Sequence, residues 1–126
     1  MNENEIATKV LDICFDIHRK LGPGLLESVY EEILCYELVK CEIPFERQKS
    51  IPVIWDGVKM SNIGFRSDVI VDGKVIVELK SVENMSPVFP KVVLTYLVVT
   101  GLKLGLLINF HEKLLKDGVS RIVNHL

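Results

Sequence analysis

Two acidic residues and a lysine, Asp68, Glu78 and Lys80, stand in a strongly apolar stretch, RSDVIVDGKVIVELKS. The dipeptide Asp72-Gly73 divides this stretch into two short runs, which is the pattern of a β-hairpin with a tight turn. Charged side chains in such strands have two explanations. They form ion pairs on a solvated sheet face, or carboxylate oxygens hold a hard divalent cation, Mg²⁺ or Mn²⁺.

The length of the turn decides which residues share a face of the hairpin, because side chains alternate along a strand. A two-residue loop pairs Val71 with Lys74 and mixes polar and apolar residues on both faces. A three-residue loop, Val71-Asp72-Gly73, pairs Ile70 with Lys74 instead and places the apolar residues on one face and the polar residues on the other. Burial of the apolar face favours this register. The apolar face then contains Phe65, Ser67, Val69, Val75, Val77 and Leu79.

The same register predicts that the charged residues converge on the other face. We expect Asp68 to lie opposite Ile76 and diagonal to Glu78, with Lys80 farther along. Two carboxylates this close repel each other unless a positive charge lies between them, which favours a bound cation. Lys80 is then placed to polarise water or to meet negative charge on a phosphate. Arg66 shares this face, either to pair with Glu78 or to touch a substrate phosphate.

Two helices are predicted before the hairpins. Apolar residues recur at helical spacing from Ile6 to Leu21, and the pattern ends at Gly22. A second helix is expected to open near Pro23 and to run to Lys40, with an apolar face that includes Leu26, Val29 and Ile33.

These helices carry three further candidate residues. His18 precedes two basic residues near a helix C-terminus, where such residues either meet a phosphate or stabilise the helix end. Glu27 falls in the first turns of the second helix, where a carboxylate favours the helix dipole. Tyr30 is expected to pack with its hydroxyl at the rim of the site, among the substrate-binding candidates.

The rest of the chain predicts strands around one more helix. The order becomes α-α-β-β-β-β-α-β-β in a single domain, residues 1–126, which is an α/β fold with a mixed sheet flanked by helices. Trp55, at the tip of the first hairpin, either stacks on bases or packs across the strands. The remaining predicted elements are the hairpin FERQKSIPVIWDGVKMSNIGF, the short buried helix SPVFPKVVLTYLVVTGLK, the doubly buried strand LGLLINF and the last strand GVSRIVNHL.

Composition limits the classes of function. A net charge of −2 gives no global attraction to nucleic acid, so a nucleic-acid partner needs a local basic patch. Three cysteines without CxxC spacing argue against a zinc site or a disulfide framework. No signal peptide or membrane span is expected, which indicates the cytoplasm and no membrane partner. A small chain with the apolar run VVLTYLVV favours a homodimer.

Three separate blocks resemble a known family. An aspartate followed by Glu78-Leu79-Lys80 at the end of an apolar strand, before a helix, resembles the PD-(D/E)XK nuclease superfamily. The run GLLESVY, Gly24 to Tyr30, is similar to the signature of the GxxExxY proteins, which are assigned to the same nuclease-like superfamily. The other two blocks are DVIVDGKVIVELKSVENMSPV and LTYLVVTGLKLGLLINF. The resemblance extends from about Ile6 to Val123.

The resemblance implies a restriction-endonuclease-like fold and Mg²⁺-dependent hydrolysis of phosphodiester bonds in DNA or RNA. It implies that Asp68 and Glu78 are metal ligands, that Lys80 is catalytic, and that Glu27 is an additional acid from the helix. The chain departs from the family pattern where Phe89 and Val92 replace the expected His and Gln. The alternative is therefore a catalytically inactive nuclease-fold module that binds a protein or a nucleic acid.

Overall fold

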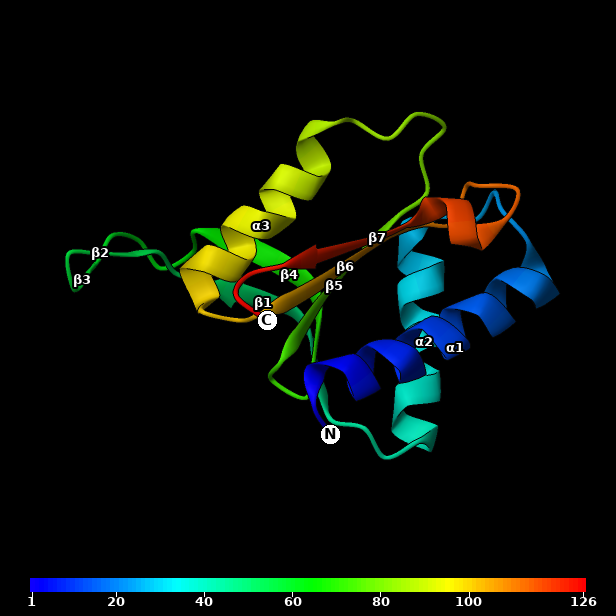
Figure 1. Ribbon diagram of the computed structural model, residues 1–126, viewed down its shortest axis with the longest axis horizontal. Coiled ribbons are helices and arrows are strands. Elements are labelled where there is room, and N and C mark those ends of the chain that lie inside the picture. The colour runs from blue at the N-terminus through cyan, green and yellow to red at the C-terminus, as the bar shows by residue number, and fades with distance from the viewer.

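A five-stranded mixed sheet forms the centre of the molecule, in the order β1-β4-β5-β6-β7 (Figure 1). The computed structural model describes all residues, 1–126. Strands β5 and β6 run parallel, and the other neighbouring pairs are antiparallel. The predicted α/β class with a mixed sheet is therefore confirmed. The strands are β1 (Phe45–Ile51), β4 (Phe65–Val71), β5 (Val75–Lys80), β6 (Leu104–Asn109) and β7 (Val119–Val123).

Helices cover both faces of this sheet (Figure 1). Helices α1 (Glu3–Leu21) and α2 (Glu27–Lys40) pack on one face, where the main hydrophobic core lies. Helix α3 (Val88–Thr100) packs on the other face over a small cluster of Ile70, Ile76 and Leu97. A short 3₁₀ helix, η1 (Leu115–Gly118), precedes β7. None of the helices is long and apolar enough to span a membrane.

The first helix matches its prediction more closely than the second. Helix α1 ends at Leu21, before Gly22, as the sequence indicates. Helix α2 begins at Glu27 rather than near Pro23, and its predicted apolar face is wrong because Leu26 is 73% exposed. The residues that it buries in the core are Tyr30, Leu34 and Leu38, which also stand at helical spacing. Apolar residues on two sides of this helix made its periodicity ambiguous.

Helix α3 lies close to the sheet because Gly105 in β6 has no side chain. A Cβ atom at this position would lie 2.6 Å from Cγ1 of Val93, which is too close for two carbon atoms. Only Val93 and Leu97 of α3 are buried, whereas Leu94 and Val98 are exposed. The prediction of a buried helix is therefore wrong, because this helix is the outer layer on its face of the sheet and nothing packs on its other side.

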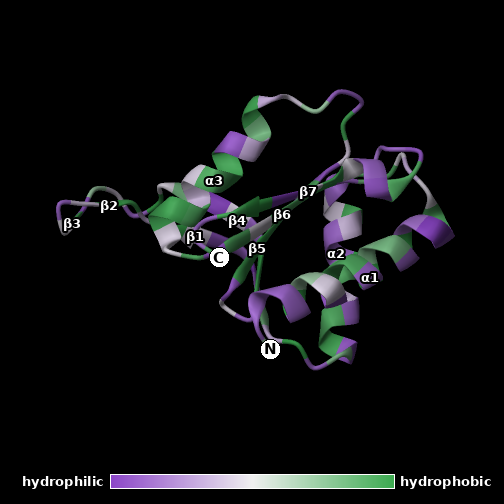
Figure 2. Ribbon diagram, in the orientation of Figure 1, coloured by the Kyte–Doolittle hydropathy of each residue, from purple (hydrophilic) through white to green (hydrophobic).

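Only the tip of the predicted first hairpin, residues 52–64, forms an arm that projects from the molecule, whereas its first strand is β1 of the main sheet (Figure 1). The strands of the arm, β2 (Ile54–Trp55) and β3 (Val58–Lys59), pair only with each other, so five strands rather than four precede α3. The other two strand predictions are confirmed: all six residues of β6 are buried, and the C-terminal segment forms β7. Figure 2 shows apolar residues along the arm and α3 as well as in the sheet.

Candidate active site

The β4–β5 hairpin turns through three residues, but not the three that the sequence suggested. Asp72 and Gly73 adopt left-handed backbone angles, with φ of 53° and 62°, and the Lys74 amide donates to the Val71 carbonyl at 3.0 Å. Val71 pairs with Val75, so the predicted pairing of Ile70 with Lys74 is wrong. The observed register places two fully buried valines opposite each other, which favours it through burial.

The β4–β5 ladder ends at the pair Val69–Val77, and beyond it side-chain carboxylates accept the hydrogen bonds of backbone amides. An oxygen of Asp68, Oδ2, accepts a hydrogen bond from the Leu79 amide at 3.0 Å. The Oε1 atom of Glu78 in turn accepts from the Asp68 amide at 3.4 Å. Each strand therefore sends a carboxylate to an amide of the other strand. The structure brings Asp68 and Glu78 together in the gap between the strands, level with each other rather than diagonal.

Side-chain alternation breaks down at this gap. Ser67 was predicted on the apolar face, but its hydroxyl donates to Glu78 Oε1 at 3.3 Å. Phe65 was predicted on the same face, yet its ring stacks on that of Tyr96 in α3 at 3.9 Å between centroids. The assignment of Phe65 is wrong because β4 is not a regular strand near Asp68, where its pairing with β1 skips the position opposite Gln48.

Gln48 joins the carboxylate pair to helix α2. Its φ of 53° lies in the left-handed region, which is rare for a residue within a strand. The Gln48 side-chain amide donates to Glu31 Oε1 at 2.7 Å and to Asp68 Oδ1 at 3.4 Å. Glu31 is buried and also accepts from Arg47 Nε at 2.6 Å. The sequence analysis missed these three residues, and no local pattern marked Gln48.

The environment of Glu78 strongly disfavours a negative charge. Burial and, second, the negative charge of Asp68 raise the pKa of Glu78 to about 9, and Lys80 opposes this only weakly. The pKa of Tyr96 is also raised, first by burial and then by the charges of Glu78 and Asp68. At neutral pH Glu78 therefore holds a proton unless a cation replaces it.

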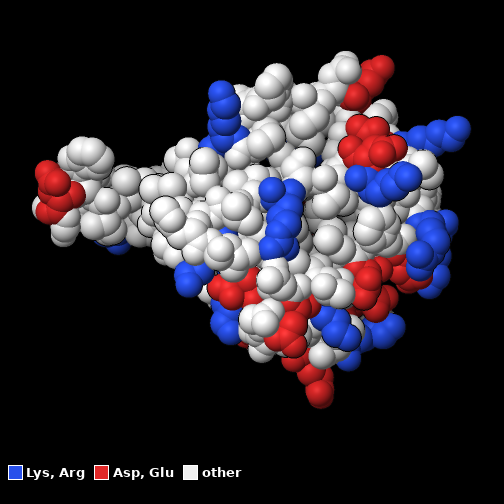
Figure 3. Space-filling model, in the orientation of Figure 1, with Lys and Arg blue, Asp and Glu red and all other residues white.

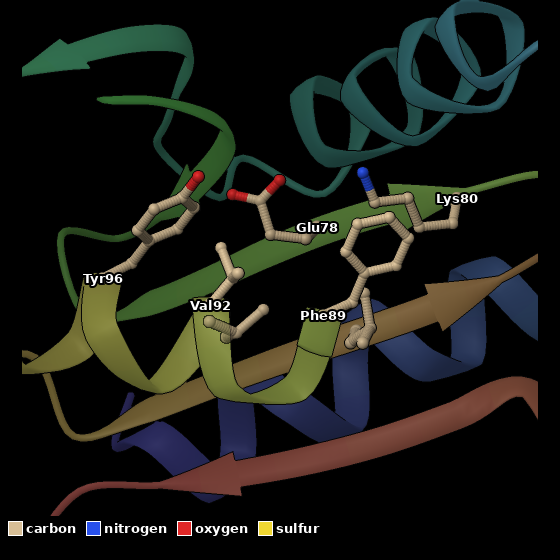
Figure 4. A pocket seen from close by; sticks show the side chains of 7 residues that line it. Glu78, Lys80, Phe89, Val92 and Tyr96 are labelled. Atoms are coloured by element: carbon tan, nitrogen blue, oxygen red, sulfur yellow. The ribbon is translucent and has the colours of Figure 1, made fainter. Parts of the chain in front are cut away.

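A small cleft of about 120 Å³ opens between Glu78 and helix α3 (Figure 4). In this view the Tyr96 hydroxyl and the Lys80 ammonium lie on either side of the Glu78 carboxylate. The Lys80 Nζ atom lies 4.4 Å from the centre of the Phe89 ring, which is a cation–π contact. Phe89 and Val92, which depart from the family pattern, thus form an apolar wall of the cleft. The other lining residues are Val93 and Leu107.

The end of β5 is fixed by the parallel strand beside it. Asn109, at the end of β6, is buried, and its side chain bonds both the amide and the carbonyl of Val82, at 3.1 and 2.9 Å. The Phe110 amide donates to the Lys80 carbonyl at 2.8 Å. These bonds fix the backbone at and after Lys80, so its side chain emerges at a defined place.

Glu27 and Arg66 are near the site without joining the pair. Glu27 is the first residue of α2 and lines a shallow hollow with Ser81 and Val82, just beyond Lys80. No group of three or more His, Cys, Asp or Glu side chains is placed to hold a metal ion, and the role of Glu27 as an additional acid stays a prediction. Arg66 is exposed and does not pair with Glu78, which leaves the phosphate contact as its predicted role.

The polar atoms of His18 and Tyr30 bond to backbone groups of the chain. His18 is only 9% exposed, and its Nε2 atom lies 2.8 Å from the backbone carbonyl of Glu112. Tyr30 is fully buried, and its ring stacks on Phe110. Its hydroxyl donates to the Gly22 carbonyl at 2.6 Å, so it holds the turn before α2 rather than the rim of the site. Both polar atoms thus have partners within the chain, and substrate binding by His18 and Tyr30 stays a prediction.

Comparison with known proteins gives one match. A family model described as the PD-(D/E)XK nuclease superfamily matches residues 4–122. The comparisons with curated proteins and with solved structures gave no match. The match is at the level of the superfamily, so the closer resemblance to the GxxExxY proteins stays a prediction.

Proposed function

Because the chain belongs to the PD-(D/E)XK nuclease superfamily, we propose that it is a Mg²⁺- or Mn²⁺-dependent nuclease that hydrolyses phosphodiester bonds of DNA or RNA. The observation that carries this proposal is the pair of carboxylates, Asp68 and Glu78, in the gap between β4 and β5. Lys80 follows on the same strand and lines the adjoining cleft.

The pair fits a hard divalent cation by its chemistry. Carboxylate oxygens are preferred ligands of Mg²⁺, which is commonly bound by one or two carboxylates and several waters. The raised pKa of Glu78 supports this, because the pair lacks the positive charge that would let both carboxylates ionise. When bound, such a cation lowers the pKa of water and neutralises charge on a phosphate.

The residues of the chain then have separate roles. The Leu79 and Asp68 amides orient the two carboxylates, and Gln48 holds the other oxygen of Asp68. The Lys80 ammonium donates to a phosphate oxygen where negative charge develops during the reaction. Arg66 is exposed two residues before Asp68, and we assign it a contact with a neighbouring phosphate of the substrate.

A second candidate function is a catalytically inactive module with the nuclease fold. The apolar wall formed by Phe89 and Val92 favours it, because a directed amide from the helix is lost there. Asp68, Glu78 and Lys80 are all present, and we therefore place the nuclease first. An inactive module would still bind its partner when the carboxylate pair is removed.

The experiment is a cleavage assay on single- and double-stranded DNA and RNA with Mg²⁺ or Mn²⁺. Lys80→Met should abolish turnover while it spares metal binding, because its role is on the phosphate. Glu78→Gln should lose both metal binding and turnover. Exposed Lys113→Met is the matched control and should cleave like wild type. Cleavage by Glu78→Gln at the wild-type rate would reject the enzyme in favour of the module.

Two further proposals concern the setting of the protein. We propose a homodimer, because a chain of 14.3 kDa contacts little of a duplex and a second copy would reach the other strand. We also propose the cytoplasm as its compartment, since Cys14 and Cys35 are buried free thiols, which suit reducing conditions.

A further inference from the structure

The projecting hairpin, residues 52–64, is called the arm below. Two residue pairs form its ladder, Ile54–Lys59 and Trp55–Val58. At its base, the Gly64 amide donates to the Ile51 carbonyl at 2.7 Å, where the arm joins the main sheet. An isolated two-stranded hairpin is marginally stable in water, so this arm needs a surface to pack on.

The arm exposes an unusual amount of apolar surface. Five of its side chains are between 53% and 67% exposed. Each presents on the order of 100 Å², so the arm offers roughly 500 Å² of apolar surface, which on a soluble chain marks an interaction site. These side chains are Ile54, Trp55, Val58, Met60 and Ile63.

The charge of the arm does not suit a nucleic acid. Asp56 and Lys59 are its only charged residues, and they cancel. Binding to a phosphate backbone depends on several Lys and Arg side chains, which the arm lacks. Figure 3 shows few charged atoms over the arm and the neighbouring helix α3. An apolar protein surface matches this composition better than a phosphate backbone does.

A surface of that kind exists on the same chain. The outer side of α3 exposes Val88, Leu94 and Val98, at 51%, 40% and 64%. Lys91 is the only charged residue in this helix. The arm extends away from the body of the molecule, so it does not cover its own α3 (Figure 1). Each chain thus carries both an apolar arm and an uncovered apolar helix face.

We propose that the arm of each chain packs on the outer face of α3 in a second copy of the chain. A twofold arrangement makes this exchange mutual, as in most homodimers. Two arms and the two faces that they cover would bury roughly 1,600 Å², which is the size of a standard protein interface. This inference specifies the homodimer proposed above and does not depend on nuclease chemistry.

Light scattering and the fluorescence of Trp55 test the exchange. Trp55 is the only tryptophan, so its emission reports on the arm alone. We expect a mass of twice 14.3 kDa and an emission maximum that shifts to shorter wavelength as dimer forms. Ile54→Glu in the arm and Val98→Lys in α3 should each weaken dimerisation by about tenfold or more. Val39→Lys, on the exposed side of α2, is the control and should leave the dimer intact.

A mixture of the two variants identifies the contact. In a heterodimer of Ile54→Glu with Val98→Lys, one arm meets α3 through opposite charges and the other contact is wild type. The mixture should therefore recover dimer that neither variant forms alone, which also shows that both variants are folded. Three results would overturn the proposal. The first is the mass of a single chain at every concentration, and the second is a dimer that neither variant weakens. The third is a shift of the Trp55 emission that appears only when an oligonucleotide is added. A dimer without cleavage would reject the nuclease and leave the exchange standing.

Discussion

Replacing Glu78 by Gln should remove the pH dependence that this residue gives to stability. The pKa of Glu78 is raised from 4.5 to about 9, mainly by burial. Between these two values the folded chain holds a proton that the unfolded chain has released. Unfolding at such a pH therefore releases one proton, and the free energy of unfolding falls as pH rises. The glutamine has no charge to bury and removes this dependence.

The size of the effect follows from the shift. Each pH unit between the two pKa values lowers the free energy of unfolding by at most about 1.4 kcal/mol. Over the range from pH 5 to pH 8, this single residue therefore costs wild type up to about 4 kcal/mol relative to Glu78→Gln. A domain of this size is stable by about 5–15 kcal/mol, so the difference is large enough to measure.

Urea unfolding at pH 5 and pH 8, with a chelator present, measures this difference. The free energy of unfolding of Glu78→Gln should exceed that of wild type at pH 8, and this excess should be several times larger than at pH 5. Exposed Glu83→Gln is the matched control and should follow wild type at both values. Added Mn²⁺ should stabilise wild type at pH 8 and have little effect on Glu78→Gln. If the free energies of unfolding of wild type and Glu78→Gln change equally from pH 5 to pH 8, Glu78 is not a buried, protonated carboxyl.

Substitutions at two further positions test how the site is held in place. Gln48→Ala should lower the free energy of unfolding by about 1–2 kcal/mol in urea unfolding, because Glu31 and Asp68 lose a donor. Gln48→Gly should lower the free energy of unfolding by less than Gln48→Ala, since glycine suits the left-handed backbone at this position. Equal losses for the two variants would show that the left-handed backbone stores no strain. Gly105→Ala should cost about 1–3 kcal/mol by the same measurement, because the new methyl group meets Val93, and an unchanged midpoint would show that α3 shifts freely.

The convergence of the acidic residues could be predicted because it depends on the parity of strand positions. Asp68 and Glu78 share a face in either three-residue register, and burial of the valines excludes the two-residue loop. The three residues that form the loop could not be predicted, because their choice depends on the left-handed backbone of Asp72. Aspartate can adopt this conformation but does not require it. The helix that covers the site was predictable from Pro87, Pro90 and Gly101, which frame it, and the parallel pair of strands from the strand–helix–strand order.

The details of the gap could not be read from the sequence. The ladder stops at Val69 because side-chain carboxylates replace backbone partners, and this exchange leaves no trace in hydrophobic alternation. Glu31 and Gln48 come from distant parts of the chain and meet only in the folded state. The internal partners of His18 and Tyr30 are hidden from the sequence for a related reason: they are the backbone carbonyls of Glu112 and Gly22, which approach these side chains only in the folded chain.

The most direct test of the carboxylate site is a calorimetric titration with Mn²⁺ at pH 7 in two buffers of different ionisation enthalpy. Because Glu78 is protonated at this pH and a metal ligand must lose its proton, binding should release close to one proton per chain. We expect one Mn²⁺ to bind per chain with this proton release, and Glu78→Gln to bind far more weakly without it. Absence of binding by wild type, or binding with no proton released, would contradict a cation site built on Asp68 and Glu78.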